Sequence, residues 1–223
     1  MNAMTSDTLA DIGAGFADPP HGAQQTFRTL LGAMSLPGRL HTLPGTATAG
    51  LEATPADMAP PMGVGMAATL LTLLDADTPV LLAGSMADAR TGAWIRFHTG
   101  ARTVMRDDAP TLAACMACDA TPAMWTRLAQ GSDEAPQDGA TLIVEVEGLS
   151  DMPNPDTDDA IALTLRGPGI ESTQDLVVRG LPGAFWQWRQ ELADALPRGV
   201  DLVLVHGKTI AAIPRSSHIE RKV

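Results

Sequence analysis

Arg96 and His98 are the first pair of side chains in this sequence that could bind an anion. An arginine is a permanent cation that can hold a phosphate or carboxylate through two hydrogen bonds, and an imidazole changes its charge near neutral pH. The run 96–99, Arg-Phe-His-Thr, places both groups beside a hydroxyl at the end of an expected helix. The alternative is structural: Arg96 pairs with an aspartate and His98 interacts with the C-terminus of that helix.

A second candidate anion site follows the last expected strand. Pro214 ends that strand, because proline lacks the N–H that a strand ladder requires. Arg215, Ser216 and His218 come directly after it. These side chains suit an anion site or a contact with a partner protein. They are weak support for a nucleophilic Ser–His pair, since the members of such a triad normally come from separate elements.

Two aspartates, Asp75 and Asp77, precede Pro79 at an expected helix-to-strand junction. An Asx turn would explain both of them in structural terms. In the alternative, one of them orients a histidine of the anion site. The candidate ligand-binding residues are therefore Asp75, Asp77, Arg96, His98, Arg215, Ser216 and His218. No catalytic residue is assigned.

Other motifs indicate less. Cys115 and Cys118 form a C-x-x-C pattern on an expected strand, where residues three apart face opposite ways, which favours buried thiols over a redox or zinc site. The acidic run 156–159 lacks EF-hand spacing and is typical of a solvated loop. The Gly-x-Gly runs 13–15 and 63–65 follow no expected strand and lack the third glycine of a dinucleotide fingerprint. No P-loop pattern occurs. From these motifs together we expect neither a metal nor a cofactor.

Composition limits the class of protein. The chain has 223 residues, 45% of them hydrophobic, with a mean hydropathy of +0.05, as in soluble globular proteins that bury a core without metals or disulfides. The net charge is −11 and the basic residues are scattered, which argues against nucleic acid or an anionic membrane as the main partner. We see no secretory signal, and the longest apolar stretch, 62–74, is too short to span a bilayer. We therefore expect a cytoplasmic protein without membrane insertion.

The elements that must position these side chains alternate between helix and strand. Residues 1–20 are expected to form a flexible tail, and 44–61 and 151–159 loops. Helices are expected at 21–35, 62–74, 88–96, 121–130 and 184–196. Strands are expected at 39–43, 80–83, 111–118, 141–146, 161–165, 175–181, 200–205 and 209–213, the last two forming a hairpin. This pattern predicts one α/β domain over residues 21–223, with a mixed sheet flanked by helices.

Seven short segments carry the most specific signal. They are Gln25–Gly38, Leu74–Val80, Arg96–Thr99, Gly139–Ile143, Leu165–Ile170, Pro197–Leu202 and Ala212–His218. In this order they resemble the PhnH family, subunits of the bacterial carbon–phosphorus lyase system for phosphonate metabolism. None is a strong motif alone, whereas seven in order are specific, and the resemblance extends over roughly residues 24–220.

The resemblance implies a fold like that of pyridoxal-phosphate-dependent transferases, without the pyridoxal phosphate site. Such enzymes hold their cofactor as a Schiff base on a lysine. Only two lysines occur, Lys208 in the expected hairpin turn and Lys222 next to the last residue, and neither position suits an internal Schiff base. The alternative of a cryptic transferase would rest on Lys208.

The resemblance also implies partners and a role. It implies a homodimer that assembles with PhnG-, PhnI- and PhnJ-type subunits, with PhnK as a further candidate, to make ribose 1-phosphonate 5-triphosphate from ATP and an alkylphosphonate. The resemblance also implies that radical bond cleavage belongs to the PhnJ-type subunit, which carries the iron–sulfur cluster. The two cysteines of this chain are too few to ligate such a cluster. We expect a non-catalytic, accessory subunit, with Trp186 and Trp188 as candidate interface or core residues. The alternative is a ligand-binding or catalytic subunit that holds phosphate or phosphonate through Arg96, His98, Arg215 and His218.

Overall fold

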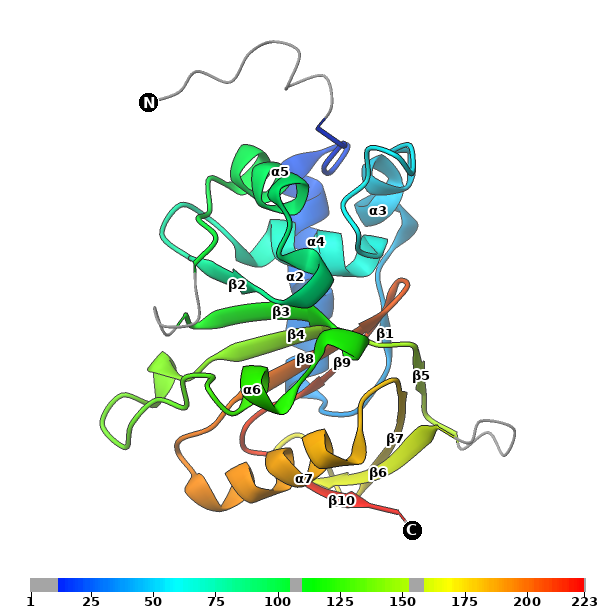
Figure 1. Cartoon of the computed structure of the whole chain (residues 1–223). Coiled ribbons are helices and arrows are strands. Elements are labelled where there is room, and N and C mark those ends of the chain that lie inside the picture. The colour runs from blue at the N-terminus through cyan, green and yellow to red at the C-terminus, as the bar shows by residue number, and fades with distance from the viewer. Residues whose placement is uncertain (1–11, 105–109, 153–158, 223) are drawn as a thin grey trace.

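The computed structural model describes residues 12–104, 110–152 and 159–222, and its centre is a six-stranded mixed sheet (Figure 1). In spatial order this large sheet contains β1 (His41–Thr42), β9 (Thr209–Ile213), β8 (Asp201–His206), β4 (Thr141–Glu145), β3 (Leu112–Met116) and β2 (Val80–Leu82). Strands β2, β3, β4 and β8 are parallel, and β9 is antiparallel to both β8 and β1. The prediction of a mixed sheet in an α/β fold is confirmed.

A second, small sheet is antiparallel throughout. Its strands, in spatial order, are β10 (His218–Arg221), β6 (Ala160–Arg166), β7 (Gln174–Arg179) and β5 (Gly148–Ser150). Together with α6 (Pro122–Trp125) and α7 (Gly183–Glu191), this sheet covers one face of the large sheet. The other face is covered by α2 (Pro19–Ser35), α3 (Gly45–Glu52), α4 (Val64–Leu73) and α5 (Ala89–Thr99) (Figure 1). Short 3-10 turns are η1 (Gly84–Met86), η3 (Ala117–Asp119), η4 (Pro136–Asp138) and η5 (Leu192–Ala195).

Strand alternation sends side chains into two separate cores. In β4, Leu142 and Val144 enter the core shared with the small sheet and α7, while Ile143 enters the core under α2 to α5. Successive side chains of a strand point to opposite faces, and strands covered on both faces are apolar at nearly every position. The apolar runs of β4 and β8 follow from this burial.

The expected hairpin at the end of the chain is confirmed. Strands β8 and β9 pair antiparallel, with Val205 opposite Ile210. Gly207 turns the chain between them at a φ of 57°, in the left-handed region that glycine adopts without steric cost.

Several expected boundaries were wrong. The expected loop 44–61 contains α3, whose Ala47 and Leu51 are buried against neighbouring helices, so tertiary packing overrides a weak local signal. Helix α5 continues to Thr99, which places Arg96 and His98 within it. Two strands, β5 and β10, were not expected, because both are short and irregular in hydrophobic pattern.

The two cysteines have different environments. Strand β3 ends at Met116, and Cys118 lies in η3 with an exposed side chain, so its predicted burial is wrong. Cys115 is buried as expected, and burial raises the pKa of its thiol to about 12. The acidic run 156–159 lies outside the described residues except for Asp159.

The tryptophan side chains belong to the core rather than to the surface. Trp186 is 0% exposed and Trp188 is 9% exposed, and Trp186 packs edge-on against Phe185 at 5.2 Å between ring centroids. The role of Trp186 as a surface anchor is therefore corrected. The exposed apolar side chains on α2 are Phe27 and Leu31 instead, at 51% and 55%. No helix in the described part of the chain combines the length and apolarity that crossing a membrane requires.

Candidate functional site

Arg215 lies at the amino-terminal edge of the parallel strands, and its guanidinium is already hydrogen-bonded to other groups of the protein. Its backbone N–H, Nε and Nη2 donate to the carboxylate of Asp201, the first residue of β8, at 2.7, 3.1 and 2.5 Å. Nη1 donates to the carbonyl of Pro136, and Nη2 lies 3.4 Å from the carbonyl of Gly139. Only 17% of the Arg215 side chain is exposed. Arg215 therefore joins three segments of the fold and has little capacity left for a ligand.

The rest of this candidate group connects the two sheets. The buried guanidinium of Arg189 in α7 donates to the carbonyls of Pro214, at 2.7 Å, and Ser217, at 3.3 Å. Ser216 is half-buried between these anchors, and His218 is exposed at the start of β10, opposite Arg166. Residues 214–217 thus carry the chain from one sheet to the other, held from both sides.

Asp75 forms the Asx turn that its sequence context allows. Its Oδ1 accepts hydrogen bonds from the hydroxyl of Thr78 at 2.7 Å and from the backbone N–H of Asp77 at 3.0 Å. These hydrogen bonds, that of Thr78 first, hold the pKa of the Asp75 carboxyl below its usual range. Among the described residues, neither aspartate bonds to a histidine.

His98 and Arg96 lie on α5 and point to different surroundings. His98 Nε2 is 2.9 Å from the carbonyl of Gly13, and its ring packs edge-on against Trp94 at 5.1 Å. Trp94 Nε1 also donates to Gly13 at 3.1 Å, so the described end of the expected tail is attached to α5, while residues 1–11 lie outside the described part. Arg96 is exposed and makes no ion pair within that part.

The seven candidate residues therefore do not converge. Asp75, Asp77, Arg96 and His98 belong to the side of α5, whereas the segment 215–218 leads into β10 at the opposite end of the molecule (Figure 1). The two lysines are also apart from one another: Lys208 pairs with Glu52 at 2.5 Å and Lys222 with Asp175 at 2.6 Å. No cluster of three or more potential metal ligands occurs among the residues that the structure describes.

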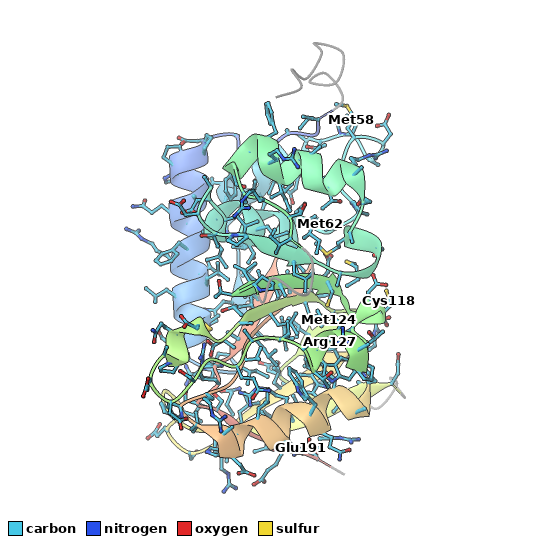
Figure 2. The ribbon with its side chains drawn as sticks, turned by 60° about the vertical axis from the view of Figure 1, so that its left-hand side comes forward. Met58, Met62, Cys118, Met124, Arg127 and Glu191 are labelled. Atoms are coloured by element: carbon cyan, nitrogen blue, oxygen red, sulfur yellow. The ribbon has the colours of Figure 1, made fainter. Side chains whose placement is uncertain are left out.

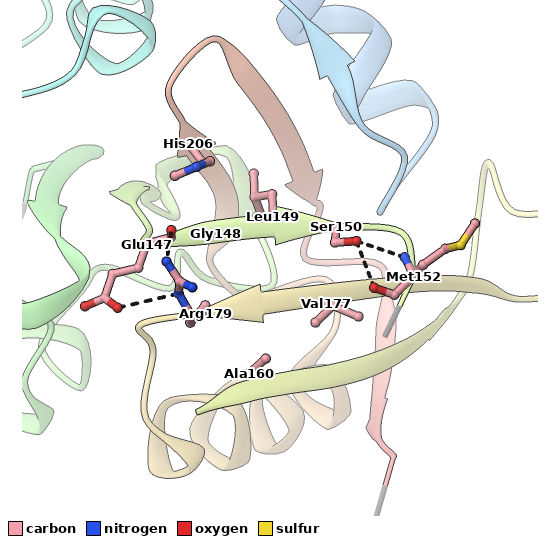
Figure 3. Close-up of a pocket in the computed structure, with 9 residues that line it drawn as sticks. All are labelled: Glu147, Gly148, Leu149, Ser150, Met152, Ala160, Val177, Arg179 and His206. Carbon is pink, nitrogen blue, oxygen red and sulfur yellow. Dashed lines mark hydrogen bonds and ion pairs between the residues drawn. The ribbon is translucent and has the colours of Figure 1, made fainter. Parts of the chain in front are cut away.

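A cavity of about 260 Å³ opens instead at the carboxyl edge of the parallel strands, between the two sheets (Figure 3). We call it the Arg179 cavity. Charged and polar side chains from three strand ends and their connections line it, namely Glu147, Ser150, Arg179 and His206. The carboxyl edge is where ligands bind in open α/β sheets, so this is the candidate functional site.

Arg179, at the end of β7, faces Glu147 across this cavity (Figure 3). Its Nη2 donates to the backbone carbonyl of Glu147 at 2.9 Å, and its Nε lies 3.8 Å from Oε2 of the same residue. Nε is buried and has no hydrogen-bond partner among the described residues. The guanidinium is thus oriented by the backbone while part of its donor capacity remains unused.

His206, the last residue of β8, contributes the second basic group. Its Nδ1 is 3.1 Å from the carbonyl of Val146, and a carbonyl can only accept, so Nδ1 carries the proton in this bond. Nε2 is then left for a ligand. Ser150 is less available, since its hydroxyl donates to the Met152 carbonyl at 2.8 Å and accepts from the Met152 N–H at 3.1 Å.

A half-buried carboxylate supports this edge from the other face of the sheet. Both oxygens of Glu145, at 2.9 and 2.7 Å, accept from the backbone N–H of Gly63, the residue that precedes α4. Burial raises the pKa of the Glu145 carboxyl, against the effect of the hydrogen bond from Gly63. Glu145 therefore ties the start of α4 to the last residue of β4, two residues before Glu147.

Sequence analysis missed Arg179, Glu147 and His206 as a group. Two of them follow expected strands at their carboxyl ends, Glu147 after 141–146 and His206 after 200–205, and the rule for ligand positions in α/β sheets would have selected them. Arg179 gave no comparable signal, because its place depends on how the small sheet packs.

Comparisons with known proteins identify the relatives of the chain. A family model described as "Bacterial phosphonate metabolism protein (PhnH)" matches residues 14–220. The chain is 36% identical over 220 residues to alpha-D-ribose 1-methylphosphonate 5-triphosphate synthase subunit PhnH of Rhizobium meliloti (strain 1021), covering 98% of this chain and 100% of that protein. A putative C-P lyase subunit protein HtxG of Stutzerimonas stutzeri is 38% identical over 89 residues, 40% of this chain and 42% of that one. With a family match across nearly its whole length, the chain belongs to the PhnH family of bacterial phosphonate metabolism proteins.

Proposed function

We propose that this chain is an accessory subunit of a carbon–phosphorus lyase assembly in organic phosphonate catabolism. There it supports the formation of ribose 1-phosphonate 5-triphosphate from ATP and an alkylphosphonate. The observation that carries the proposal is the alignment with the Rhizobium meliloti synthase subunit, which spans 98% of this chain and all of that protein. A match of such extent makes a shared role the simplest inference.

The partners in this proposal are PhnG-, PhnI- and PhnJ-type subunits, with PhnK as a further candidate, and a second copy of the chain when it is isolated. The exposed Phe27 and Leu31 lie one turn apart on α2, and apolar side chains of this size at the surface suit a protein contact. The cytoplasm is the proposed location, because ATP is the co-substrate.

The finer part of the fold proposal is a relation to pyridoxal-phosphate-dependent transferases in which the cofactor site is lost. It is supported by the mixed sheet and by the positions of Lys208 and Lys222, both paired with surface carboxylates and neither lining the Arg179 cavity. The single-domain organisation over residues 21–223 and the flexibility of residues 1–20 remain predictions of the sequence.

Genetic complementation combined with co-purification tests the accessory role. In a strain that lacks its own PhnH gene, the full-length chain is expected to restore growth on methylphosphonate as sole phosphorus source and to co-purify with the sister subunits. The double variant Phe27→Glu, Leu31→Glu should fold, since both side chains are more than half exposed, yet co-purify poorly.

The matched control is Leu196→Glu, another exposed apolar position, at 44%, outside α2. It should co-purify like the unchanged chain. A full-length chain that is folded but neither restores growth nor binds any sister subunit would contradict the proposed function.

A further inference from the structure

We infer that the Arg179 cavity binds the monoanion of an alkylphosphonate, with Arg179 and the imidazolium form of His206 donating to the anionic oxygens and Glu147 accepting from the P–OH group. The inference rests on the proposed function for the choice of a phosphonate, and on the geometry of the cavity for everything else. It assigns a ligand site to a subunit whose role is otherwise described through its partners.

The first argument is unused hydrogen-bonding capacity. The Arg179 side chain is 40% exposed, and its Nη2 is held by the Glu147 carbonyl at 2.9 Å. Within the described part of the chain, Nε is buried without a hydrogen-bond partner and Nη1 makes no hydrogen bond. An oxyanion in the cavity can therefore pair with the Nη groups of a guanidinium that the Glu147 carbonyl already orients, and arginine is suited to hold such anions.

The second argument is the carboxylate beside this cation. Oε2 of Glu147 lies 3.8 Å from Nε of Arg179, near enough to repel a fully ionised oxyanion in the same space. A phosphonate keeps a P–OH group near neutral pH, whereas sulfate is fully ionised. Glu147 can accept the P–OH hydrogen, so its presence favours phosphonate or phosphate and disfavours sulfate.

The third argument concerns the apolar part of the lining. Leu149, Val177 and Ala160 face the same cavity as Arg179 (Figure 3). They offer an apolar contact to the carbon substituent of a phosphonate, which inorganic phosphate lacks. This favours an alkylphosphonate over phosphate among anions that carry a P–OH group.

Size favours a small ligand. The cavity volume is about 260 Å³, below the roughly 300–1,000 Å³ of pockets that enclose drug-sized molecules. A small phosphonate fits within it, whereas a whole nucleoside triphosphate would extend out of it. The site therefore suits the phosphonate reactant rather than the nucleotide.

Calorimetric titration of the full-length chain tests the inference, with methylphosphonate, inorganic phosphate and sulfate as separate probes. We expect affinity to fall in that order. Arg179→Met should weaken methylphosphonate binding about ten-fold or more, as the loss of charged hydrogen bonds of about 1.5–3 kcal/mol implies. Glu147→Gln should raise sulfate binding and remove the preference for methylphosphonate over sulfate, because the amide can donate to an ionised oxygen.

Arg127 provides the matched control, since it is an exposed arginine near α6, away from the cavity (Figure 2). Arg127→Met should bind all three probes as the unchanged chain does. No methylphosphonate binding by the folded chain, or equal binding by Arg179→Met, would overturn the inference. So would an unaltered preference over sulfate in Glu147→Gln. Growth complementation is measured separately, so a failed titration beside restored growth rejects this site and leaves the accessory role intact.

Discussion

The two edges of the large sheet each hold an arginine beside a carboxylate, but the two pairs differ in how completely they are used. At the amino edge, Arg215 Nη2 and Asp201 Oδ2 are 2.5 Å apart, with side chains 17% and 15% exposed. At the carboxyl edge, Arg179 Nε and Glu147 Oε2 are 3.8 Å apart, with side chains 40% and 55% exposed. The side chains of the amino-edge pair are bonded to one another and to the fold. The carboxyl-edge pair leaves hydrogen-bond donors and acceptors available to another molecule.

The difference shows why residue type alone is a poor guide to function. Arg215 stands in a polar run that suggests a site, yet its hydrogen bonds go to Asp201 and to two backbone carbonyls of the segment before β4. Arg179 stands in an ordinary strand, yet its guanidinium faces a cavity. An arginine can bind a ligand only with the N–H groups that the fold leaves free.

The largest expected effect is on the amino edge. Arg215→Ala should lower the free energy of unfolding by about 3 kcal/mol, because it leaves the Asp201 carboxylate little exposed and without its charged partner. Urea denaturation measures this change, with Arg127→Ala as the exposed-arginine control. Unchanged stability in Arg215→Ala would remove the distinction between the two edges.

The next effect concerns how stability depends on pH at the carboxyl edge. The pKa of Glu145 is raised by burial, so the folded state binds its proton more tightly than the unfolded state. The contribution of this carboxyl is therefore fully present below its unfolded pKa and is lost as pH rises through the raised, folded value. Relative to Glu145→Gln, the unchanged chain should become less stable as pH rises across this window.

Chemical denaturation at a series of pH values measures that slope. Glu147→Gln is the comparison, because Glu147 is more than half exposed. If the unchanged chain and Glu145→Gln show the same pH dependence, the Glu145 carboxyl does not carry this effect.

The smallest expected effect is on the stability of the carboxyl-edge pair. Arg179→Ala should change the free energy of unfolding by less than about 1 kcal/mol, because an ion pair this exposed is screened by solvent. Thermal melting tests this in parallel with Arg215→Ala. A loss as large as that of Arg215→Ala would mean that both edges serve stability alike.

Local patterns made much of the fold predictable. Short apolar runs marked β4 and β8, and the glycine turn between 206 and 208 marked the terminal hairpin, because these signals depend on neighbouring residues only. Helix α3 was not predictable in this way, since its burial comes from contacts with α2 and α4. Strand β10 was missed because Pro214 ends β9, and the sequence after it does not show that the chain enters a second sheet.

The site was less predictable than the fold. Glu147 and His206 stand where strands end, which the sequence shows, but their approach to Arg179 requires the small sheet to pack against the large one. That packing depends on contacts between β5, β7 and β8, which lie far apart in the chain. Composition and residue spacing therefore could not predict that these three side chains lie around one cavity.

The crossing at residues 214–217 bears on how the cavity behaves. Arg215 holds this segment from the side of the large sheet and Arg189 from the side of α7, so the connection between the sheets has few ways to flex. The walls of the cavity come from both sheets, and a connection held from two sides limits how far the sheets can move relative to one another before a ligand binds. Binding of an anion in this cavity would therefore require little conformational change of the protein, which lowers the free-energy cost of binding.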